Sequence, residues 1–389
     1  MKADQSRVYI LFGAPGSGKS TALTDLSARS HTPIRVIAKQ TTRPRRHDDG
    51  PDIVSVETIA TDCDVRYYSY RHEYGFRTAD IWQAFEGGES AGIIVNDIRT
   101  LRILKQRFGV LAVIIYVHSN VDPDRLQEIM AKRHPSKTAH ELEFDVKRRI
   151  EKIDTIHRKY IENTALFDST ILNLYGEGEL GSLEALSRQL DNLLESGPPA
   201  SRGERSPVRV FLLVGASSSG KDELVTAMQS MEPRRIQNYT KGTDRPERPD
   251  DHGELRHYPA GLPEQFDIVY ARQTFKYGIA SNELWQNLAN GKISLLVVSD
   301  PPTISLLLER FGRVCTVIYL HANLNKNEMR KRMTQQGLSI DEIEERLQAV
   351  DELHQLYVQR TTLFQHVLLN TGEPEDLYDQ AFNILDHYC

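Results

Sequence analysis

The chain has 389 residues, of which 39% are hydrophobic and 26% are charged, and its formal net charge is −6. This length suits two domains better than one, and the composition is that of an ordinary globular protein. There is no run of about 20 apolar residues for a membrane span and no strongly basic balance for nucleic acid, so we expect neither partner.

The three cysteines, Cys63, Cys315 and Cys389, are widely separated in the sequence. This spacing indicates neither a zinc cluster nor a disulfide framework. The first residues lead directly into a strand-like pattern without the apolar stretch of a secretory signal. Both features favour a reducing compartment, and we expect a cytoplasmic protein.

The first predicted element is an apolar strand at residues 8–12, which leads into a glycine-rich loop and a helical pattern at residues 21–29. Further apolar strands are predicted at residues 93–95 and 111–117. Runs that are apolar throughout are typical of parallel strands covered on both faces. Their alternation with helices predicts an α/β fold, a mainly parallel sheet flanked by helices.

The loop after the first strand matches the phosphate-binding pattern G-x-x-x-x-G-K-S/T at every defined position. In this pattern backbone N–H groups point at phosphate oxygens, the lysine reaches the β- and γ-phosphates, and the hydroxyl can hold Mg²⁺. We expect ATP and Mg²⁺ here, with Lys19 catalytic and Ser20 a metal ligand; the alternative is a glycine-rich turn with an incidental lysine. The predicted nucleotide-binding residues are Gly13, Ala14, Pro15, Gly16, Ser17, Gly18, Lys19, Ser20 and Thr21.

The second half of the chain repeats the first. Lys221 follows Lys19 by 202 positions, as Arg245 follows Arg43, and later pairs keep nearly the same offset in the same order. An ordered match of unrelated residue types predicts a tandem duplication.

The repeat divides the chain into two domains joined by a linker rich in glycine, proline and serine. We place domain 1 at residues 1–194, the linker at 195–207 and domain 2 at 208–389. In domain 2 the expected elements are strands at residues 208–214, 295–298 and 314–320 and a helix at 338–357.

Domain 2 has its own glycine loop, in which Asp222 occupies the position of the serine or threonine. Either Asp222 ligates Mg²⁺, which accepts carboxylates readily, or its charge repels the triphosphate and this copy has lost catalysis. The sequence leaves both interpretations open. The predicted nucleotide-binding residues of this loop are Gly215, Ser217, Ser218, Ser219, Gly220, Lys221 and Asp222, with Lys221 also catalytic.

With these loops, the segment Thr41-Thr42-Arg43-Pro44-Arg45-Arg46 and the pair Tyr74-Gly75, the chain resembles the guanylate kinase family and its relative ribose 1,5-bisphosphate phosphokinase. The resemblance extends over nearly all of both halves, and domain 2 is more similar to the second family. It implies two nucleoside-monophosphate-kinase-like domains, each with a lid, and phosphotransferase activity.

The resemblance also implies where the acceptor phosphate binds. Arginine suits this task because its guanidinium can grip phosphate with two parallel hydrogen bonds. The implied acceptor-binding residues are Arg43, Arg46 and Tyr74 in domain 1 and Arg245, Arg248 and Tyr277 in domain 2. Without the resemblance, the basic segment could be a solvated turn.

Arginines of a lid that closes over the triphosphate are implied as well. Arg133 and Arg149 take these positions in domain 1, and Arg346 takes the second one in domain 2. Only Arg330 or Arg332 could replace the first one in domain 2. Solvated helix faces are the alternative for these basic clusters. Domain 1 is therefore expected to be the catalytic copy.

Asp97 and Asp300 each end an apolar strand, where open α/β sheets often carry site residues. They could organise Mg²⁺ or contact the acceptor, and on this interpretation Asp97 is a catalytic residue. The alternative is that both are plain turn aspartates. Asn173 and Asn370 follow later strands, where the resemblance implies residues near the adenine ring.

The chain departs from guanylate kinases at the base-reading positions. Pro51-Asp52-Ile53-Val54 replaces their tyrosine segment, and Phe76 follows Tyr74-Gly75 where they have a small hydroxyl residue. We therefore expect an ATP-dependent kinase whose small acceptor carries phosphate, either a nucleoside monophosphate or a ribose bisphosphate. The alternative is a nucleotide-binding regulatory or scaffolding protein with one or both domains inactive. The oligomeric state is not indicated.

Overall fold

The computed structural model describes residues 6–29, 33–46, 49–69, 71–119, 126–128, 130–131, 138–173, 183–196, 208–216, 219–247, 254–272, 274–322, 326–335 and 337–388. The chain divides into two compact units. Unit 1 comprises Met1–Pro199 with His354–Thr362, and unit 2 comprises Ala200–Leu353 with Leu363–Cys389. The division after residue 199 falls inside the predicted linker, of which only the end of a helix is described; the domain limits stay a prediction.

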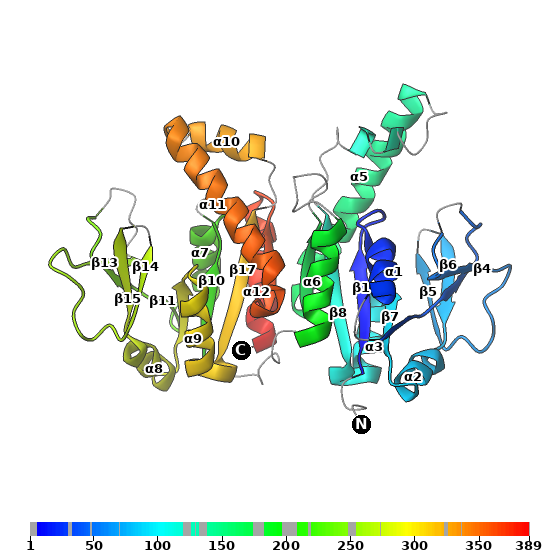
Figure 1. Cartoon of the computed structure of the whole chain (residues 1–389), viewed down its shortest axis with the longest axis horizontal. Coiled ribbons are helices and arrows are strands. Elements are labelled where there is room, and N and C mark those ends of the chain that lie inside the picture. Colours follow the sequence, from blue (N-terminus) through cyan, green and yellow to red (C-terminus); the bar gives the residue numbers. More distant parts are fainter. Residues whose placement is uncertain are drawn as a thin grey trace. The chain divides into compact units, whose positions relative to one another are not determined.

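Unit 1 is built on a five-stranded parallel sheet in the order β2-β7-β1-β8-β9 (Figure 1). Every residue of β1, β7, β8 and β9 is buried. Helices cover the sheet, and burial of its apolar side chains away from water is favourable. The strands are β1 (Val8–Gly13), β2 (Ile34–Val36), β7 (Ser90–Ile94), β8 (Ala112–Ser119) and β9 (Ser169–Asn173). The helices beside them are α1 (Lys19–Arg29), α3 (Ile98–Phe108), α5 (Ala139–Ile161) and α6 (Leu183–Ser196).

A smaller four-stranded sheet in unit 1 has the order β4-β3-β6-β5. Its β3–β4 pair is parallel, and its other two pairs are antiparallel. The strands are β3 (Lys39–Thr41), β4 (Ile53–Ser55), β5 (Val65–Ser69) and β6 (His72–Phe76), and α2 (Thr78–Glu86) leads from this sheet to β7.

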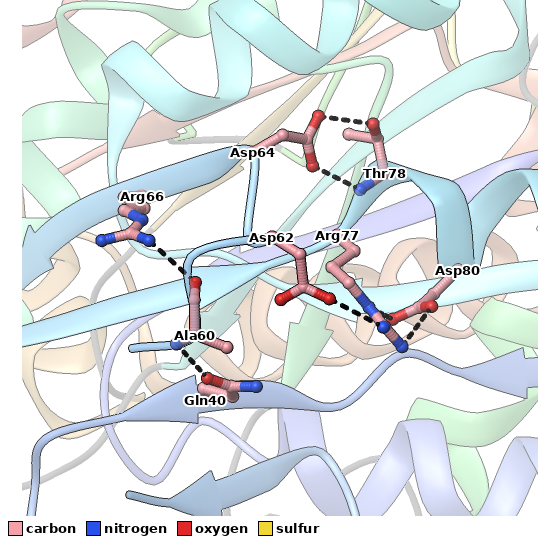
Figure 2. Close-up of polar contacts among 8 residues, drawn as sticks. All are labelled: Gln40, Ala60, Asp62, Asp64, Arg66, Arg77, Thr78 and Asp80. Atoms are coloured by element: carbon pink, nitrogen blue, oxygen red, sulfur yellow. Dashed lines mark hydrogen bonds and ion pairs between the residues drawn. The ribbon is translucent and has the colours of Figure 1, made fainter. Parts of the chain in front are cut away.

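Polar contacts tie the smaller sheet to α2, as Figure 2 shows. The Asp64 carboxylate accepts from the Thr78 N–H (2.7 Å) and hydroxyl (2.6 Å) at the start of the helix. Arg77 bridges Asp62 (3.0 Å) and Asp80 (2.8 Å). These contacts hold the sheet in a fixed position relative to α2, which matters because β3 and β6 carry candidate site residues.

Unit 2 has the same topology. Its parallel five-stranded sheet has the order β11-β16-β10-β17-β18, and its smaller sheet the order β13-β12-β15-β14. The strands are β10 (Arg209–Val214), β11 (Ile236–Asn238), β12 (Lys241–Thr243), β13 (Leu255–His257), β14 (Ile268–Arg272), β15 (Phe275–Ile279), β16 (Ile293–Val297), β17 (Cys315–Ala322) and β18 (His366–Asn370). The helices are α7 (Lys221–Met231), α8 (Ser281–Ala289), α9 (Pro301–Phe311), α10 (Lys326–Gln335), α11 (Ile340–Gln359), of which residues 354–359 belong to unit 1, and α12 (Pro374–Tyr388).

The expected α/β fold, parallel sheets flanked by helices, is confirmed. The strands predicted from apolar runs are all present, and the helix predicted at 338–357 is α11. Cys315 is buried in β17, and burial raises the pKa of its thiol to about 12. Among the helices of the described ranges, none has the length and apolar composition to span a membrane.

Candidate functional site

The predicted phosphate loop of unit 1, residues 13–20, connects the C-terminal end of β1 to α1 and is called phosphate loop 1 below. Gly16 and Gly18 have φ values of 83° and 89°, which a side chain would disfavour. The Ser17 N–H donates back to the Ala14 carbonyl (3.1 Å). The loop therefore curls over the start of α1, where helix N–H groups without intrahelical partners favour an anion.

Lys19 is folded back over this loop and is 7% exposed. Its Nζ donates to the carbonyls of Gly13 (2.8 Å) and Ala14 (2.5 Å) and to Ser17 Oγ (3.2 Å). Burial, and after it the charge of Lys39, lowers the pKa of Lys19 to about 7. The carbonyls thus hold the ammonium in a place where phosphate oxygens would be stronger partners.

Arg149, predicted to be a lid residue, lies on α5 against this loop. Its guanidinium occupies the space beside Gly16, so that a methyl group there would overlap it. Its charge also acts on Lys19. The structure therefore brings together two of the predicted catalytic residues, which lie 130 positions apart in the sequence.

Asn173, at the end of β9, contacts the loop itself. Its Nδ2 donates to the Ser17 carbonyl (3.0 Å), and Asn370 makes the same bond to Ser219 in unit 2 (2.9 Å). The sequence analysis expected these asparagines near an adenine ring and missed this contact. A buried amide on a loop carbonyl helps to fix the loop's conformation.

Asp97 is the N-cap of α3. Its Oδ2 accepts from the Thr100 N–H (2.8 Å) and hydroxyl (2.7 Å). Asp300 caps α9 in the same way through Thr303. Capping agrees with the alternative that the sequence left open, a turn aspartate. It uses one carboxylate oxygen, Oδ2, of each aspartate as a hydrogen-bond acceptor. The Asp97 charge also acts on Tyr67 of the smaller sheet.

The predicted acceptor residues Arg43 and Tyr74 lie together at the smaller sheet. The Arg43 guanidinium donates to Asp49 Oδ1 (2.5 Å) and to the Pro44 carbonyl (3.2 Å), and it lies within hydrogen-bonding reach of the Tyr74 side chain. Tyr74 stacks on Tyr67 with ring centroids 5.3 Å apart. This arrangement can hold a phosphate if the ligand displaces Asp49.

Arg46 is exposed beyond the end of β3. Its charge acts on Lys152 of α5, as do those of Arg148 and Arg149. Arg46 is therefore close enough to the predicted lid helix for their charges to interact.

Lys39, in β3, is a candidate site residue that the sequence analysis missed. Its side chain is 4% exposed, its Nζ donates to the Ile94 carbonyl (2.5 Å), and it lies 5.9 Å from the centre of the Tyr74 ring. Burial lowers its pKa from 10.5 to about 8; the buried Asp52 opposes this shift, and Arg43 adds to it. The repeat offset, which pairs Lys39 with Lys241 and Asp52 with Glu254, could have revealed both residues.

Unit 2 contains the equivalent lysine, Lys241. Its Nζ donates to the Val297 carbonyl (2.8 Å) and lies 5.6 Å from the centre of the Tyr277 ring, which stacks on Tyr270. Burial lowers its pKa to about 8, with Glu254 opposing this shift and Arg272, Lys221 and Arg245 adding to it.

The second phosphate loop, residues 215–222, is described only in part. Lys221 Nζ donates to the carbonyls of Gly215 (3.0 Å) and Ala216 (2.5 Å), as Lys19 does in unit 1. Asp222 is exposed at the start of α7.

The candidate lid arginines of unit 2 have different surroundings. Arg346 lies half-buried on α11, and Arg330 pairs with Glu344 (2.8 Å). Arg332 lies against Gly372, two residues after Asn370. Four of the predicted site residues, Arg133, Ser217, Ser218 and Arg248, lie outside the described residues.

Within the described ranges no three His, Cys, Asp or Glu side chains are grouped as a metal site would require. Ser20, in the first turn of α1, is exposed. A hydroxyl at the end of a phosphate loop can ligate Mg²⁺ whose other ligands are phosphate and water oxygens. The residues present therefore fit a metal ion carried in with a nucleotide.

Two of the buried lysines, Lys39 and Lys241, predict how stability depends on pH. Lys39 and Lys241 each have a folded-state pKa of about 8, below the ordinary 10.5. The unfolded chain therefore binds more protons above pH 7, and the free energy of unfolding rises with pH, by about 1 kcal/mol for each lysine between pH 7 and 9. We expect urea denaturation to show a smaller rise for Lys39→Met and Lys241→Met than for the wild type. An equal rise in all three proteins would contradict this assignment.

The comparisons with known proteins do not assign the chain to a family. No family model matches the chain, and no curated protein matches its sequence. Among solved structures it is similar to the guanylate kinase of Anaplasma phagocytophilum, with 13% identity and a TM-score of 0.31, over 50% of this chain and 88% of that chain. At this TM-score the similarity supports no functional conclusion.

Proposed function

We propose that this protein is an ATP-dependent kinase that transfers the γ-phosphoryl group to a small acceptor that already carries phosphate. A nucleoside monophosphate and a ribose bisphosphate are the two candidate acceptors. The observation that carries the proposal is the position of the Arg149 guanidinium, directly on phosphate loop 1 and close enough to Lys19 to affect its charge. A solvated basic helix face would not bring an arginine onto a phosphate-binding loop.

In the proposed reaction Lys19 exchanges the carbonyls of Gly13 and Ala14 for oxygens of the β- and γ-phosphates. The N-terminus of α1 receives the same phosphates. Ser20 would hold Mg²⁺, which neutralises phosphate charge when bound. Arg149 stabilises the charge that spreads over the oxygens of the transferring group.

In the proposed reaction the acceptor is held by residues at the smaller sheet. Its phosphate replaces Asp49 on Arg43, and the Tyr74 hydroxyl and Arg46 add further donors. An acceptor oxygen then attacks the γ-phosphorus in line as the bond to the β-phosphate breaks, and ADP leaves. Positioning and charge neutralisation supply most of the rate.

We propose further that the chain is a tandem duplication of one guanylate kinase-like domain, with unit 1 the catalytic copy. The shared strand order of the two units and the repeated Lys39–Tyr74 arrangement support the duplication. A regulatory, nucleotide-binding role for unit 2 is the second candidate. The exposed Asp222 carboxylate favours it, because a negative charge at this position repels the phosphates unless Mg²⁺ intervenes.

A coupled assay of ADP release tests the proposal. The wild-type protein with ATP and Mg²⁺ is given a panel of nucleoside monophosphates, ribose phosphates and ribose bisphosphates. We expect at least one of them to raise ADP release well above the rate with ATP alone. If none does, while ATP still binds, the kinase assignment is wrong and the regulatory alternative gains support.

A further inference from the structure

In both units a buried lysine is close enough to the loop lysine and to the first of the predicted acceptor arginines for their charges to interact. In unit 1 it is Lys39, at the point where the smaller sheet meets the end of β7. Within the described part of the chain, the Ile94 carbonyl is the one hydrogen-bond acceptor for its ammonium. An ammonium has three N–H donors, so two of them are left for a ligand in a place that water barely reaches.

The charges around Lys39 leave this place positive. Lys19 is close enough for the two like charges to disfavour each other, and Arg43 acts on Lys39 in the same sense. Asp52 is a buried carboxylate that opposes them, and Asp49 pairs with Arg43 (2.5 Å), so that these three cations face two carboxylates. Buried cations that outnumber their counter-ions are costly unless an anion joins them.

Unit 2 repeats this arrangement with different neighbours. Lys241 is also buried, also donates to a carbonyl at the end of the equivalent strand, and also lies beside the stacked tyrosine pair. Its carboxylate neighbour is Glu254 in place of aspartate. The lysine is retained although the phosphate loop and the carboxylate have changed, which points to a ligand common to both units.

We propose that Lys39 binds an anionic oxygen of the acceptor, between Lys19 and Arg43, and that it selects acceptors with an anionic group in addition to the phosphate on Arg43. The proposal rests on the kinase function proposed above. The Tyr74 ring, stacked on Tyr67, lies on one side of the ammonium, with its centre 5.9 Å from Nζ. A neutral base offers this ammonium weaker acceptors than a phosphate or carboxylate oxygen does.

The test uses Lys39→Met and Lys39→Gln in the full chain. Methionine removes the charge at similar length, and glutamine keeps a donor for the Ile94 carbonyl. With a non-hydrolysable ATP analogue saturating the phosphate loops, pyrophosphate binding is measured by calorimetry. Loss of a buried charge-assisted contact is expected to weaken binding by about 10- to 100-fold in both variants. In the kinase assay, the KM of a doubly anionic acceptor rises by a similar factor while kcat changes little.

Lys105→Met is the matched control. Lys105 donates to the Ala112 carbonyl (2.7 Å) and pairs with Asp168 (2.9 Å) near the opposite end of the sheet, since Ala112 is the register partner of Val8, the first residue of β1. This variant should bind pyrophosphate as the wild type does. The melting temperature of the ligand-free protein distinguishes a binding role of Lys39 from a structural one. Removing a buried charge with too few partners should not lower the melting temperature, whereas removing a structural lysine should.

The outcomes separate this proposal from the kinase function. Unchanged pyrophosphate affinity in both Lys39 variants overturns it, and so does a fall in melting temperature without a change in affinity. A fall in kcat with KM unchanged also overturns it, because Lys39 would then act on the transferring group. If no acceptor supports ADP release but pyrophosphate binding depends on Lys39, the kinase function fails and the anion site stands.

Discussion

We expect Lys19→Met to lower the rate of acceptor-dependent ADP release about 1000-fold, because the variant loses a buried cation that faces the developing phosphate charge. Methionine has nearly the length of lysine and fills the space over Gly13 and Ala14 without the charge. The matched change in unit 2, Lys221→Met, removes a lysine with the same two carbonyl contacts. With unit 1 as the catalytic copy, this second variant should keep nearly the wild-type rate.

The two variants together show whether unit 1, unit 2, both or neither of the glycine loops carries catalysis. If Lys221→Met is the inactive variant and Lys19→Met keeps its rate, unit 2 is catalytic and the role proposed for Asp222 is wrong. If both variants lose activity, both units contribute. If neither does, the glycine loops are not the catalytic sites. Binding of a fluorescent ATP analogue, measured in parallel, distinguishes loss of transfer from loss of nucleotide binding.

The sequence predicts well what depends on neighbouring residues. The turn from β1 into α1 is such a feature, since its glycines fall within eight consecutive positions and the adjoining apolar strand sets its place at the end of the sheet. Phosphate binding by this turn stays a prediction. The apolar runs that became β8 and β17 were equally clear, because strands buried on both faces need no alternation.

Contacts between distant residues explain what the sequence did not predict. Lys39 belongs to a three-residue strand with no apolar pattern, and a lysine in such a segment is usually exposed. Its burial depends on the end of β7, 55 positions away. The contact of Asn173 with the Ser17 carbonyl likewise spans 156 positions. Asp97 is the opposite case, because its cap on α3 is a local contact with Thr100 and agrees with the turn aspartate that the sequence left open as an alternative.

Arg149→Ala is the second change with a large expected effect. An arginine that neutralises charge on a transferring phosphoryl group contributes about 1000-fold or more to the rate. We expect a loss of this size in kcat, with the KM of the acceptor little changed, because Arg149 contacts the phosphate loop while Arg43 belongs to the smaller sheet. Single-turnover measurements with saturating ATP provide the test. A loss confined to KM would show that Arg149 only aids binding.

Gly16→Ala tests whether the contact itself matters. The new methyl group would overlap the Arg149 guanidinium, and at φ 83° it also costs about 1 kcal/mol of stability. Gly88→Ala is the matched control, since Gly88 has φ 75° and open space where the methyl group would lie. Both variants should lose similar stability, but only Gly16→Ala should slow transfer.

The double variant Gly16→Ala/Arg149→Ala then isolates the mechanism. If the methyl group acts by displacing Arg149, the double variant should be no slower than Arg149→Ala alone, because two changes that remove the same interaction are not additive. Additive losses would mean that Gly16 serves the phosphates directly through its backbone. In that case the guanidinium position seen on the loop would not be the one used in transfer.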